Sequence, residues 1–174
     1  MRKICSYCRK ELWQEPSQDL DQVSHGMCVE CYLHFKQQWK GLSLGQYLDQ
    51  FDFPVVIVDD DVRLVAANQV MADLLNMNGR DVFGLLGGEV MECVYARLPE
   101  GCGRTMHCST CTFRNSVKHT ISTKEPLEDV PASIDADDDT VHFKISTRII
   151  DDGEGTEAVH VTLKDVFKGK ADRG

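Results

Sequence analysis

Four of the eight cysteines lie close together in the middle of the chain, among residues that favour turns. The segment reads CVYARLPEGCGRTMHCSTC, and its cysteines are Cys93, Cys102, Cys108 and Cys111. Their spacing is C-x8-C-x5-C-x2-C, and one proline and two glycines bend the backbone between them. Cysteine thiolates bind zinc, other soft metals and iron–sulfur clusters, and pairs of thiols form disulfides. The segment therefore predicts a metal site, an iron–sulfur site or a redox switch.

The other four cysteines form two C-x-x-C pairs near the N-terminus. Nineteen residues separate the pair Cys5 and Cys8 from the pair Cys28 and Cys31, a spacing typical of four-cysteine zinc sites. We expect these thiolates to hold a structural zinc ion. A site filled by four thiolates has no open ligand position, so catalysis is not expected there. His25 is an alternative ligand, although packing or hydrogen bonding is its simpler role.

The length of 174 residues fits one domain, or a domain of about 120 residues with a smaller appendage. The first residues, MRKICSYC, lack the apolar run of a signal peptide, and no stretch approaches the roughly 18 apolar residues of a membrane helix. We therefore expect a cytoplasmic protein. Thiols stay reduced in the cytoplasm, so eight cysteines favour metal ligation over disulfides there. Secretion by a route without a signal peptide is the alternative.

The formal net charge of −9 is unevenly distributed. Residues 1–40 carry six Lys or Arg and five Asp or Glu, whereas the remaining residues carry thirteen and twenty-three. An acidic body repels a phosphate backbone, and the nearly neutral N-terminal part has few cations. Direct nucleic-acid binding is therefore not expected.

Two helical stripes follow the N-terminal cysteines. Tyr32, Phe35 and Trp39 recur at helical spacing, and a second apolar stripe runs from Leu44 to Phe51. We expect these helices to pack on the next domain or on a second copy of the chain.

The remaining residues predict two hairpins around a helical middle. Pro54–Asp59 and Val62–Ala67 read as an antiparallel pair of strands. Asn68 is expected to cap a helix that ends at Asn78-Gly79, and Asp81–Val90 is expected to be a turn of helix and a loop.

Beyond the second cysteine cluster, Thr112–Thr123 has the period of a helix, with Ser109 or Thr110 as its N-cap. Glu128–Asp135 contains Pro131 and is expected at a sheet edge. Val141–Ile149 and Ala158–Val166 alternate as strands. These elements predict the α+β class, with an antiparallel sheet that carries helices on one face.

This order of elements resembles the PAS domain over about residues 45–167. The resemblance rests on PVVIVDDDVRLVAANQVMADLL near its start and on VTLKDV near its end. It implies a five-stranded antiparallel sheet, a ligand or cofactor pocket between sheet and helices, a sensory or interaction role, and homodimerisation. The N-terminal CSYC…SHGMCVEC also looks like a cysteine-rich module that precedes PAS domains in some bacterial signalling proteins.

The sequence departs from well-known cofactor-binding subclasses of PAS domains. No C-x-x-C is followed by His, which excludes covalent c-type haem by motif. The asparagine–cysteine–arginine signature of flavin photoreceptor domains is missing from Gly79–Val94. His107 and His119 are the candidates in the helical half for a non-covalent haem.

In a PAS-like fold, the Cys93–Cys111 segment would border the cofactor pocket. It has four interpretations: an iron–sulfur sensor site, a second structural zinc site, a dithiol–disulfide switch, or small apolar core residues. Cys111 precedes a helix N-terminus that would stabilise a thiolate, and His107 is an alternative ligand. The spacing alone does not separate iron from zinc.

We therefore predict residues 1–35 as a zinc-binding knuckle, 36–50 as a connecting helix, 51–167 as a PAS-like sensor domain and 168–174 as a tail. The predicted function is a non-enzymatic cytoplasmic sensor of redox, oxygen or metal state. Its output would pass through a dimer or a downstream signalling partner, with transcription as one possible target. The alternative is a zinc-stabilised interaction module with two structural zinc sites. A thiol oxidoreductase using Cys108 and Cys111 is the enzymatic alternative.

Overall fold

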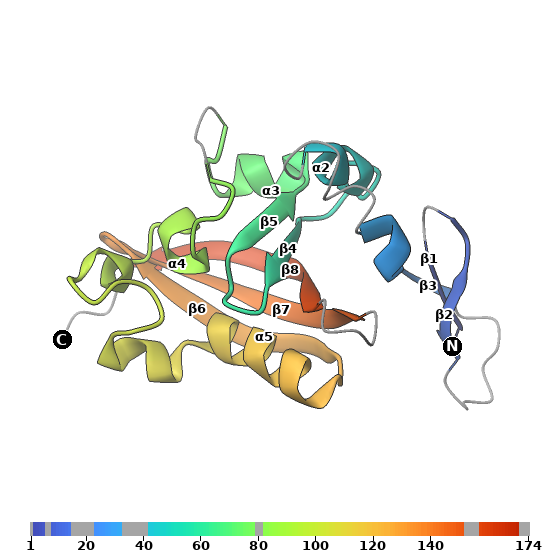
Figure 1. Cartoon of the computed structure of the whole chain (residues 1–174). Coiled ribbons are helices and arrows are strands. Elements are labelled where there is room, and N and C mark those ends of the chain that lie inside the picture. The colour runs from blue at the N-terminus through green and yellow to red at the C-terminus, as the bar shows by residue number, and fades with distance from the viewer. Residues whose placement is uncertain are drawn as a thin grey trace.

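A five-stranded antiparallel sheet forms the centre of the molecule (Figure 1). The computed structural model describes residues 2–5, 8–14, 23–32, 42–78, 82–151 and 157–170. The strands of this sheet are β4 (Val55–Asp59), β5 (Leu64–Ala67), β6 (Leu127–Ala136), β7 (Asp139–Asp151) and β8 (Glu157–Lys170). Their order is β5-β4-β8-β7-β6, and all neighbours are antiparallel. The predicted α+β fold with its two hairpins is confirmed.

The strands of the C-terminal half follow the predicted pattern with one difference. Strand β6 lies at an edge of the sheet, as predicted from Pro131. Proline has no backbone N–H to donate, and an edge strand tolerates this because it has a neighbouring strand on one side only. Strand β8 extends through Lys170, so residues 168–170 pair with β7 rather than belonging to a tail. The long β7–β8 pairing supplies these extra residues with backbone partners.

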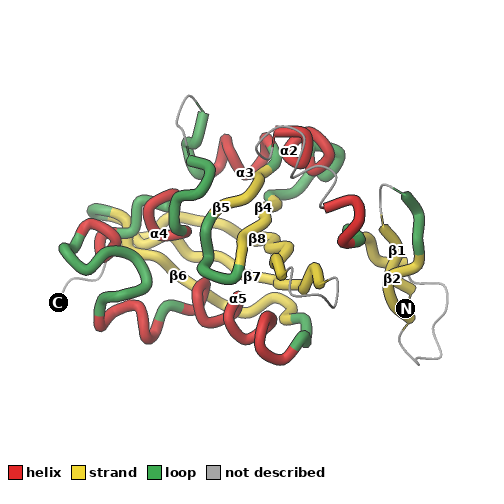
Figure 2. Tube along the Cα trace, in the orientation of Figure 1, coloured by secondary structure: helices red, strands yellow, loops and turns green. Residues whose placement is uncertain are grey.

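Helices cover one face of the sheet, where most of the core lies. They are α3 (Gln69–Leu74), α4 (Gly87–Val90), the 3₁₀ turns η1 (Val94–Arg97) and η2 (Met106–Thr110), and α5 (Thr112–Thr123). Between α3 and α5 the described chain is mostly loop and short helical turns (Figure 2). Phe113 and Val117 of α5 pack on inward side chains such as Ile145 of β7. The predicted bounds and the buried stripe of α5 are confirmed.

Two predicted helix termini differ from the structure. Asn68 caps α3 as predicted, but the helix ends at Leu74 instead of Asn78. Asn76 adopts a left-handed φ of 52°, and the N–H of Met77 donates to the carbonyl of Ala72. This is the arrangement of a Schellman motif, which Asn accommodates at its left-handed position. The earlier asparagine therefore ends the helix.

The N-cap of α5 is Cys111, and the prediction of Ser109 or Thr110 was wrong. The hydroxyls of Ser109 and Thr110 instead donate to the carbonyls of Met106 and His107 within η2. Because these hydroxyls are used inside the 3₁₀ turn, neither serves the first N–H groups of α5.

The opposite face of the sheet is partly covered by the N-terminal part of the chain. Strands β1 (Arg2–Cys5), β2 (Glu11–Gln14) and β3 (Val23–Gly26) form a small sheet of order β2-β1-β3, and residues 29–32 are helical. Helix α2 (Leu42–Leu48) confirms the second predicted stripe. The rest of the predicted helix from Tyr32 to Trp39 lies outside the described residues. Within the described part of the chain, no helix is long and apolar enough to cross a membrane.

Candidate functional site

The N-terminal cysteines form a compact four-sulfur group. The ligand atoms of Cys5, Cys8, Cys28 and Cys31 all lie within 4.8 Å of one another. The Sγ atoms of Cys8 and Cys28 are 3.6 Å apart. This separation is far longer than the ~2.05 Å of a disulfide. It matches the ~3.8 Å expected between two thiolates that bind one zinc ion through bonds of ~2.3 Å.

Two tight turns bring these sulfurs together. After Cys5 the chain turns back so that the N–H of Arg9 donates to the Cys5 carbonyl, with Arg9 at a left-handed φ of 64°. In the second turn the N–H of Cys31 donates to Cys28 Sγ at 3.4 Å. Each C-x-x-C therefore aims both of its sulfurs at one point, as predicted from the spacing.

Burial disfavours the bare thiolate form of Cys28 and Cys31. Burial raises the pKa of the Cys28 thiol to about 11 and raises the pKa of Cys31 as well. Thiols in this environment stay neutral at pH 7 unless a metal ion replaces their protons. The arrangement is compatible with a four-thiolate metal site. The side chain of His25 lies outside the described residues.

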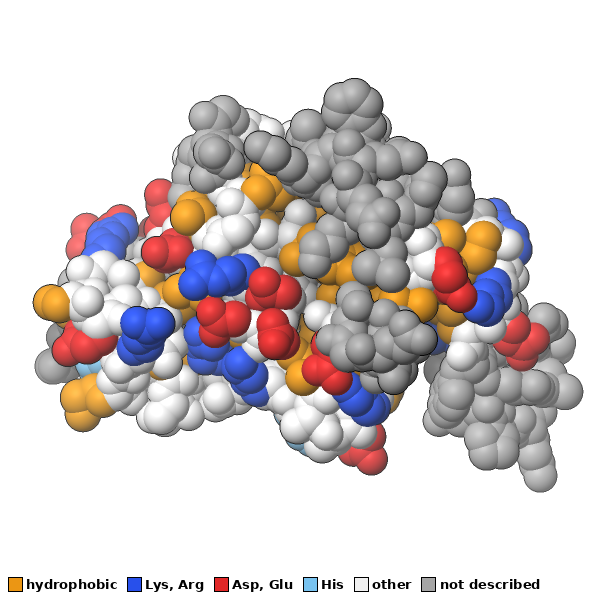
Figure 3. All heavy atoms as spheres, in the orientation of Figure 1, with side chains coloured by type: hydrophobic (Ala, Val, Ile, Leu, Met, Phe, Trp, Pro, Cys, Tyr) orange, Lys and Arg blue, Asp and Glu red, His pale blue; other side chains and the backbone are white. Residues whose placement is uncertain are grey.

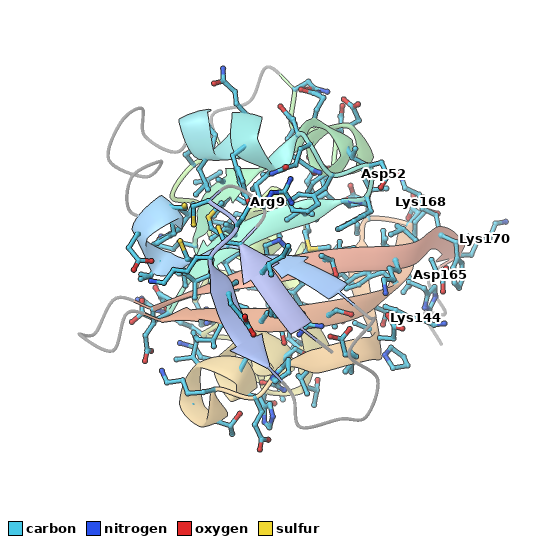
Figure 4. All side chains as sticks on the ribbon, turned by 90° about the vertical axis from the view of Figure 1, so that its right-hand side faces the viewer. Arg9, Asp52, Lys144, Asp165, Lys168 and Lys170 are labelled. Carbon is cyan, nitrogen blue, oxygen red and sulfur yellow. The ribbon has the colours of Figure 1, made fainter. Side chains whose placement is uncertain are left out.

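This four-cysteine group shares a core with the large sheet. Cys5, Cys28 and Cys31 are buried in one cluster with Tyr32, helix α2 and the outward side chains of the sheet, which are Val55, Ile57, Ala66, Ile150 and Ala158. Figure 4 shows the N-terminal strands in front of the sheet, with Lys168 and Lys170 to the right of Arg9. The first four of the five residues of β4 are therefore buried, on both faces of the sheet.

The second four cysteines come from consecutive turns on the helical side. Cys93 is the N-cap of η1, Cys108 lies in η2 and Cys111 is the N-cap of α5. Cys102 lies in the intervening turn between Gly101 and Gly103, whose φ angles of 78° and 86° are left-handed. Glycine adopts such angles without strain, which explains the turn-rich spacing of this segment.

All four of these cysteines line a single pocket. Its volume is about 470 Å³ including its open side, and it lies between the β4–β5 turn, α4 and α5. The remaining lining side chains include Tyr95, His107, Phe113 and Arg114. Tyr95 and His107 stack with their ring centroids 3.9 Å apart, and the Tyr95 hydroxyl donates to Asp135 of β6. The second cysteine cluster thus lies beside the sheet, as predicted, and lines a defined cavity there.

Hydrogen-bond donors point at the sulfurs of this pocket. Burial raises the pKa of the Cys93 and Cys102 thiols, but backbone N–H groups oppose the rise at both. For Cys102 the donor is Gly88. Burial acts in the same direction on Cys108, but hydrogen bonds from Thr105 and Gly103 outweigh it and lower the pKa of that thiol. N–H···S bonds of this kind stabilise thiolates, which are the metal-binding form of cysteine.

The two clusters differ in how closely their sulfurs approach. Among the residues that the structure describes, the N-terminal four are the one group of cysteine, histidine or acidic side chains placed to share a metal ion, with ligand atoms within 4.8 Å of one another. Cys93, Cys102, Cys108 and Cys111 surround a cavity instead of a point. All eight cysteines are free thiols. The second cluster can therefore hold a larger group or change its arrangement when it is filled.

Sequence reasoning missed Arg114, whose guanidinium group lines this pocket. Arg114 lies three residues after Cys111 in the sequence. A cation this close to a C-x-x-C pair was the signal that could have indicated a residue facing the thiols. Of the two histidines considered for haem, His107 lines the pocket, whereas His119 is exposed on α5.

A second cavity adjoins the cysteine pocket and is entirely apolar. It encloses about 300 Å³ including its opening, between β4, α3, α4 and α5. Gly87 and Phe113 line both cavities, so the ring of Phe113 stands between them. The space between sheet and helices is therefore divided into two neighbouring cavities.

Comparison with known proteins identifies the fold. No protein-family model matches the sequence, and no curated protein matches it. The PAS domain of BvgS from Bordetella pertussis superimposes with a TM-score of 0.50 over 71% of this chain and 84% of that domain, at 15% sequence identity. The chain has a PAS fold.

Two further solved structures are similar to this PAS fold. A domain of an HTR-like protein from Haloarcula marismortui matches with a TM-score of 0.44, 11% identity and coverage of 64% of this chain and 94% of that one. VqmA of Vibrio cholerae, described as a LuxR-type receptor that binds DNA, matches with a TM-score of 0.49 and 17% identity. That match covers 72% of this chain and 52% of VqmA.

Proposed function

We propose that this protein is a cytoplasmic, non-enzymatic PAS sensor whose input site is the pocket of Cys93, Cys102, Cys108 and Cys111. The observation that carries the proposal is that four thiols line one cavity beside the sheet, with backbone donors directed at the sulfurs of Cys93, Cys102 and Cys108. Such a cavity suits the binding of a metal centre by thiolates. The signal is the redox, oxygen or metal state that fills, empties or oxidises this centre.

The N-terminal cysteines then have a structural role as a zinc site. Their sulfurs lie close enough to share one ion, and three of the four are buried in a common core with the sheet. Zinc bound by four thiolates has no open coordination position and contributes directly to folding. In this proposal the N-terminal cluster stabilises the fold, and the second cluster receives the signal.

The cavity that the second cluster lines favours an iron–sulfur cluster as its occupant. In a [4Fe–4S] cluster each of four thiolates binds its own iron, so the thiolates lie farther apart than around one zinc ion. The four cysteines line a cavity and do not form a second close group among the described residues. A zinc ion would require them to converge to the ~3.8 Å spacing of a single tetrahedral site.

Helix α5 is the element through which this site would act. Cys111 immediately precedes α5, and the helix packs on β6, β7 and β8. The hydroxyls of Thr120 on α5 and Thr147 on β7 form a buried hydrogen bond at 2.6 Å. A change at Cys111 would bias the packing of this helix, and the sheet would pass the change to a second copy or to a downstream partner.

Transcription is one candidate process for the output. The charge distribution of the described surface does not favour direct binding of nucleic acid, however. Acidic side chains lie among the basic ones on the face shown in Figure 3. The net charge of −9 also opposes binding to a phosphate backbone. We therefore propose a homodimer or a protein partner as the immediate target.

The proposal is tested by purifying the full chain without oxygen and measuring visible absorption, iron, acid-labile sulfide and zinc. We expect about one zinc ion and one iron–sulfur cluster per chain, with Cys108→Ser losing iron but retaining zinc. A colourless, iron-free protein would refute the iron–sulfur assignment. Two zinc ions per chain and no response to oxidant would favour the zinc-stabilised interaction module.

A further inference from the structure

Arg114 occupies an unusual position between the second cysteine site and the β4–β5 turn. Its side chain is 15% exposed and lines the cysteine pocket. The guanidinium packs directly on Gly103, where a Cβ atom would overlap it. Gly103 therefore serves two purposes, because it adopts a left-handed φ and leaves room for the arginine.

The guanidinium of Arg114 is only partly satisfied in this position. Its Nε is buried and has no hydrogen-bond partner among the described residues. Its contacts with Asp61 are long, at 3.5 Å from Nη2 to the carbonyl oxygen and 4.0 Å from Nη1 to the carboxylate. Its charge acts on the thiols of Cys102 and Cys108. A buried cation with spare donors beside four thiols is arranged to receive negative charge.

A filled site supplies that negative charge whichever metal it holds. Four thiolates around a zinc ion, or around a [4Fe–4S] cluster in its 2+ state, leave two net negative charges. Cys93 and Cys102 are half-buried, so water screens this charge incompletely. Among the described side chains that line the pocket, Arg114 is the one Lys or Arg, and His107 is the other basic residue.

The turn on the other side of Arg114 holds backbone strain. Val62 is 2% exposed and has a φ of 64°, which is an outlier for a β-branched residue. It lines the same pocket, and its carbonyl accepts the N–H of Gly87 at 2.9 Å. One helical turn beyond Arg114, Lys118 donates to the carbonyl of Asp60. Helix α5 is thus attached to a strained turn by two cations.

We propose that Arg114 is the charge-compensating residue of the second cysteine site and that it links occupancy of the site to the conformation of the Asp59–Arg63 turn. In the empty site Arg114 is held by Asp61. When the site is filled, the guanidinium moves toward the sulfurs and releases Asp61. This inference rests on the proposed function, but it holds for either a zinc ion or an iron–sulfur cluster.

The test compares Arg114→Gln, Arg114→Lys and Lys118→Gln in the full chain. Lys118→Gln is the matched control, because it removes a cation from the same helix and the same turn but not from the pocket. Each protein is reconstituted without oxygen using ferrous iron and sulfide. Iron loss to a chelator, the midpoint potential and hydrogen exchange at residues 59–63 are then measured in filled and empty protein.

We expect Arg114→Gln to lose iron about 10- to 100-fold faster than the wild type, the usual effect of removing a group that supports metal ligands. Its midpoint potential should fall, because a cation no longer stabilises the reduced cluster. Arg114→Lys should recover much of both properties, and Lys118→Gln should match the wild type in iron loss and midpoint potential. Exchange at residues 59–63 should differ between filled and empty wild type but not in Arg114→Gln.

Equal iron loss and potential in Arg114→Gln and the wild type would overturn charge compensation. Equal exchange at residues 59–63 in filled and empty wild type would overturn the link to the turn. If the wild type takes up zinc rather than iron, the same comparison is made by chelator competition for zinc. A wild type that takes up neither metal at these cysteines would overturn the proposed function, and this inference with it.

Discussion

The Sγ atom of Cys102 lies against the backbone of Gly88, where an added Cβ atom would be 2.8 Å away. The N–H of the same glycine is directed at this sulfur. Position 88 therefore forms part of the wall of the second cysteine site, and it is filled by the residue that allows the closest approach of backbone to sulfur.

Gly88→Ala should displace Cys102 and weaken the second site while the fold is retained. We expect metal content there to fall about tenfold or more, because a ligand and its N–H···S bond are both disturbed. Gly169→Ala is the control, since its Cβ would meet nothing nearer than 3.5 Å. Metal analysis and circular dichroism of both variants provide the measurement. Unchanged metal content in Gly88→Ala would show that Cys102 is not a ligand.

Removing metal from the N-terminal site should destabilise the large sheet as well as the N-terminal strands. Cys5, Cys28 and Cys31 share a buried core with Ile57 and Ala158, so loss of the ion would open this core. We expect Cys28→Ser or a strong chelator to lower the free energy of unfolding by about 3 kcal/mol or more. Thermal unfolding and hydrogen exchange in β4 would measure the effect. Metal loss without any change in β4 exchange would contradict it.

His160 should make stability depend on pH in the mildly acidic range. Burial lowers the pKa of this histidine from 6.5 to about 4, and the positive charges of Lys3 and Arg148 act in the same direction. Because the folded-state pKa is below the unfolded value, the neutral histidine supports the fold fully above pH 6.5. That stability is lost as the pH falls toward 4, and the total is roughly 3 kcal/mol.

His160→Leu isolates this contribution, because acidic groups elsewhere affect both proteins equally. The difference in unfolding free energy between wild type and variant should change steadily from pH 7 to pH 4.5 in denaturant titrations. Parallel pH profiles for the two proteins would show that His160 stays accessible to protons in the folded state.

Asn68 should be among the residues whose replacement is least tolerated. Its buried Oδ1 accepts the N–H groups of Val55 and Met71 at 3.0 Å each, and its Nδ2 donates to the carbonyl of Phe53 at 2.8 Å. Asn68→Asp keeps the acceptor but places a carboxylate against a carbonyl oxygen. We expect a loss of about 3 kcal/mol or more in unfolding free energy.

Asn78→Asp is the matched control for this change, because Asn78 makes exposed side-chain hydrogen bonds. Its effect on urea unfolding should stay within about 1 kcal/mol. Similar losses in the two variants would mean that the buried network around Asn68 is not a principal support of α3 and β4.

Local patterns in the sequence determined much of this protein. The period of Phe113, Val117 and Ile121 gave the bounds of α5, and the C-x-x-C spacing gave the N-terminal four-sulfur group. These features depend on residues near one another in the chain or on turns of fixed geometry, so spacing is enough to predict them. The end of α3 was misplaced because two asparagines two residues apart offer the same signal, and the chain uses Asn76.

Tertiary structure alone decided how the two cysteine clusters are used. The N-terminal group lies on one face of the sheet, and the second group lines a cavity on the helical side. Spacing cannot show that Arg114 folds back over Gly103 toward Cys102, because that contact depends on how α5 packs beside the β4–β5 turn. Long-range packing sets the distances between sulfurs, and those distances decide what each cluster can bind.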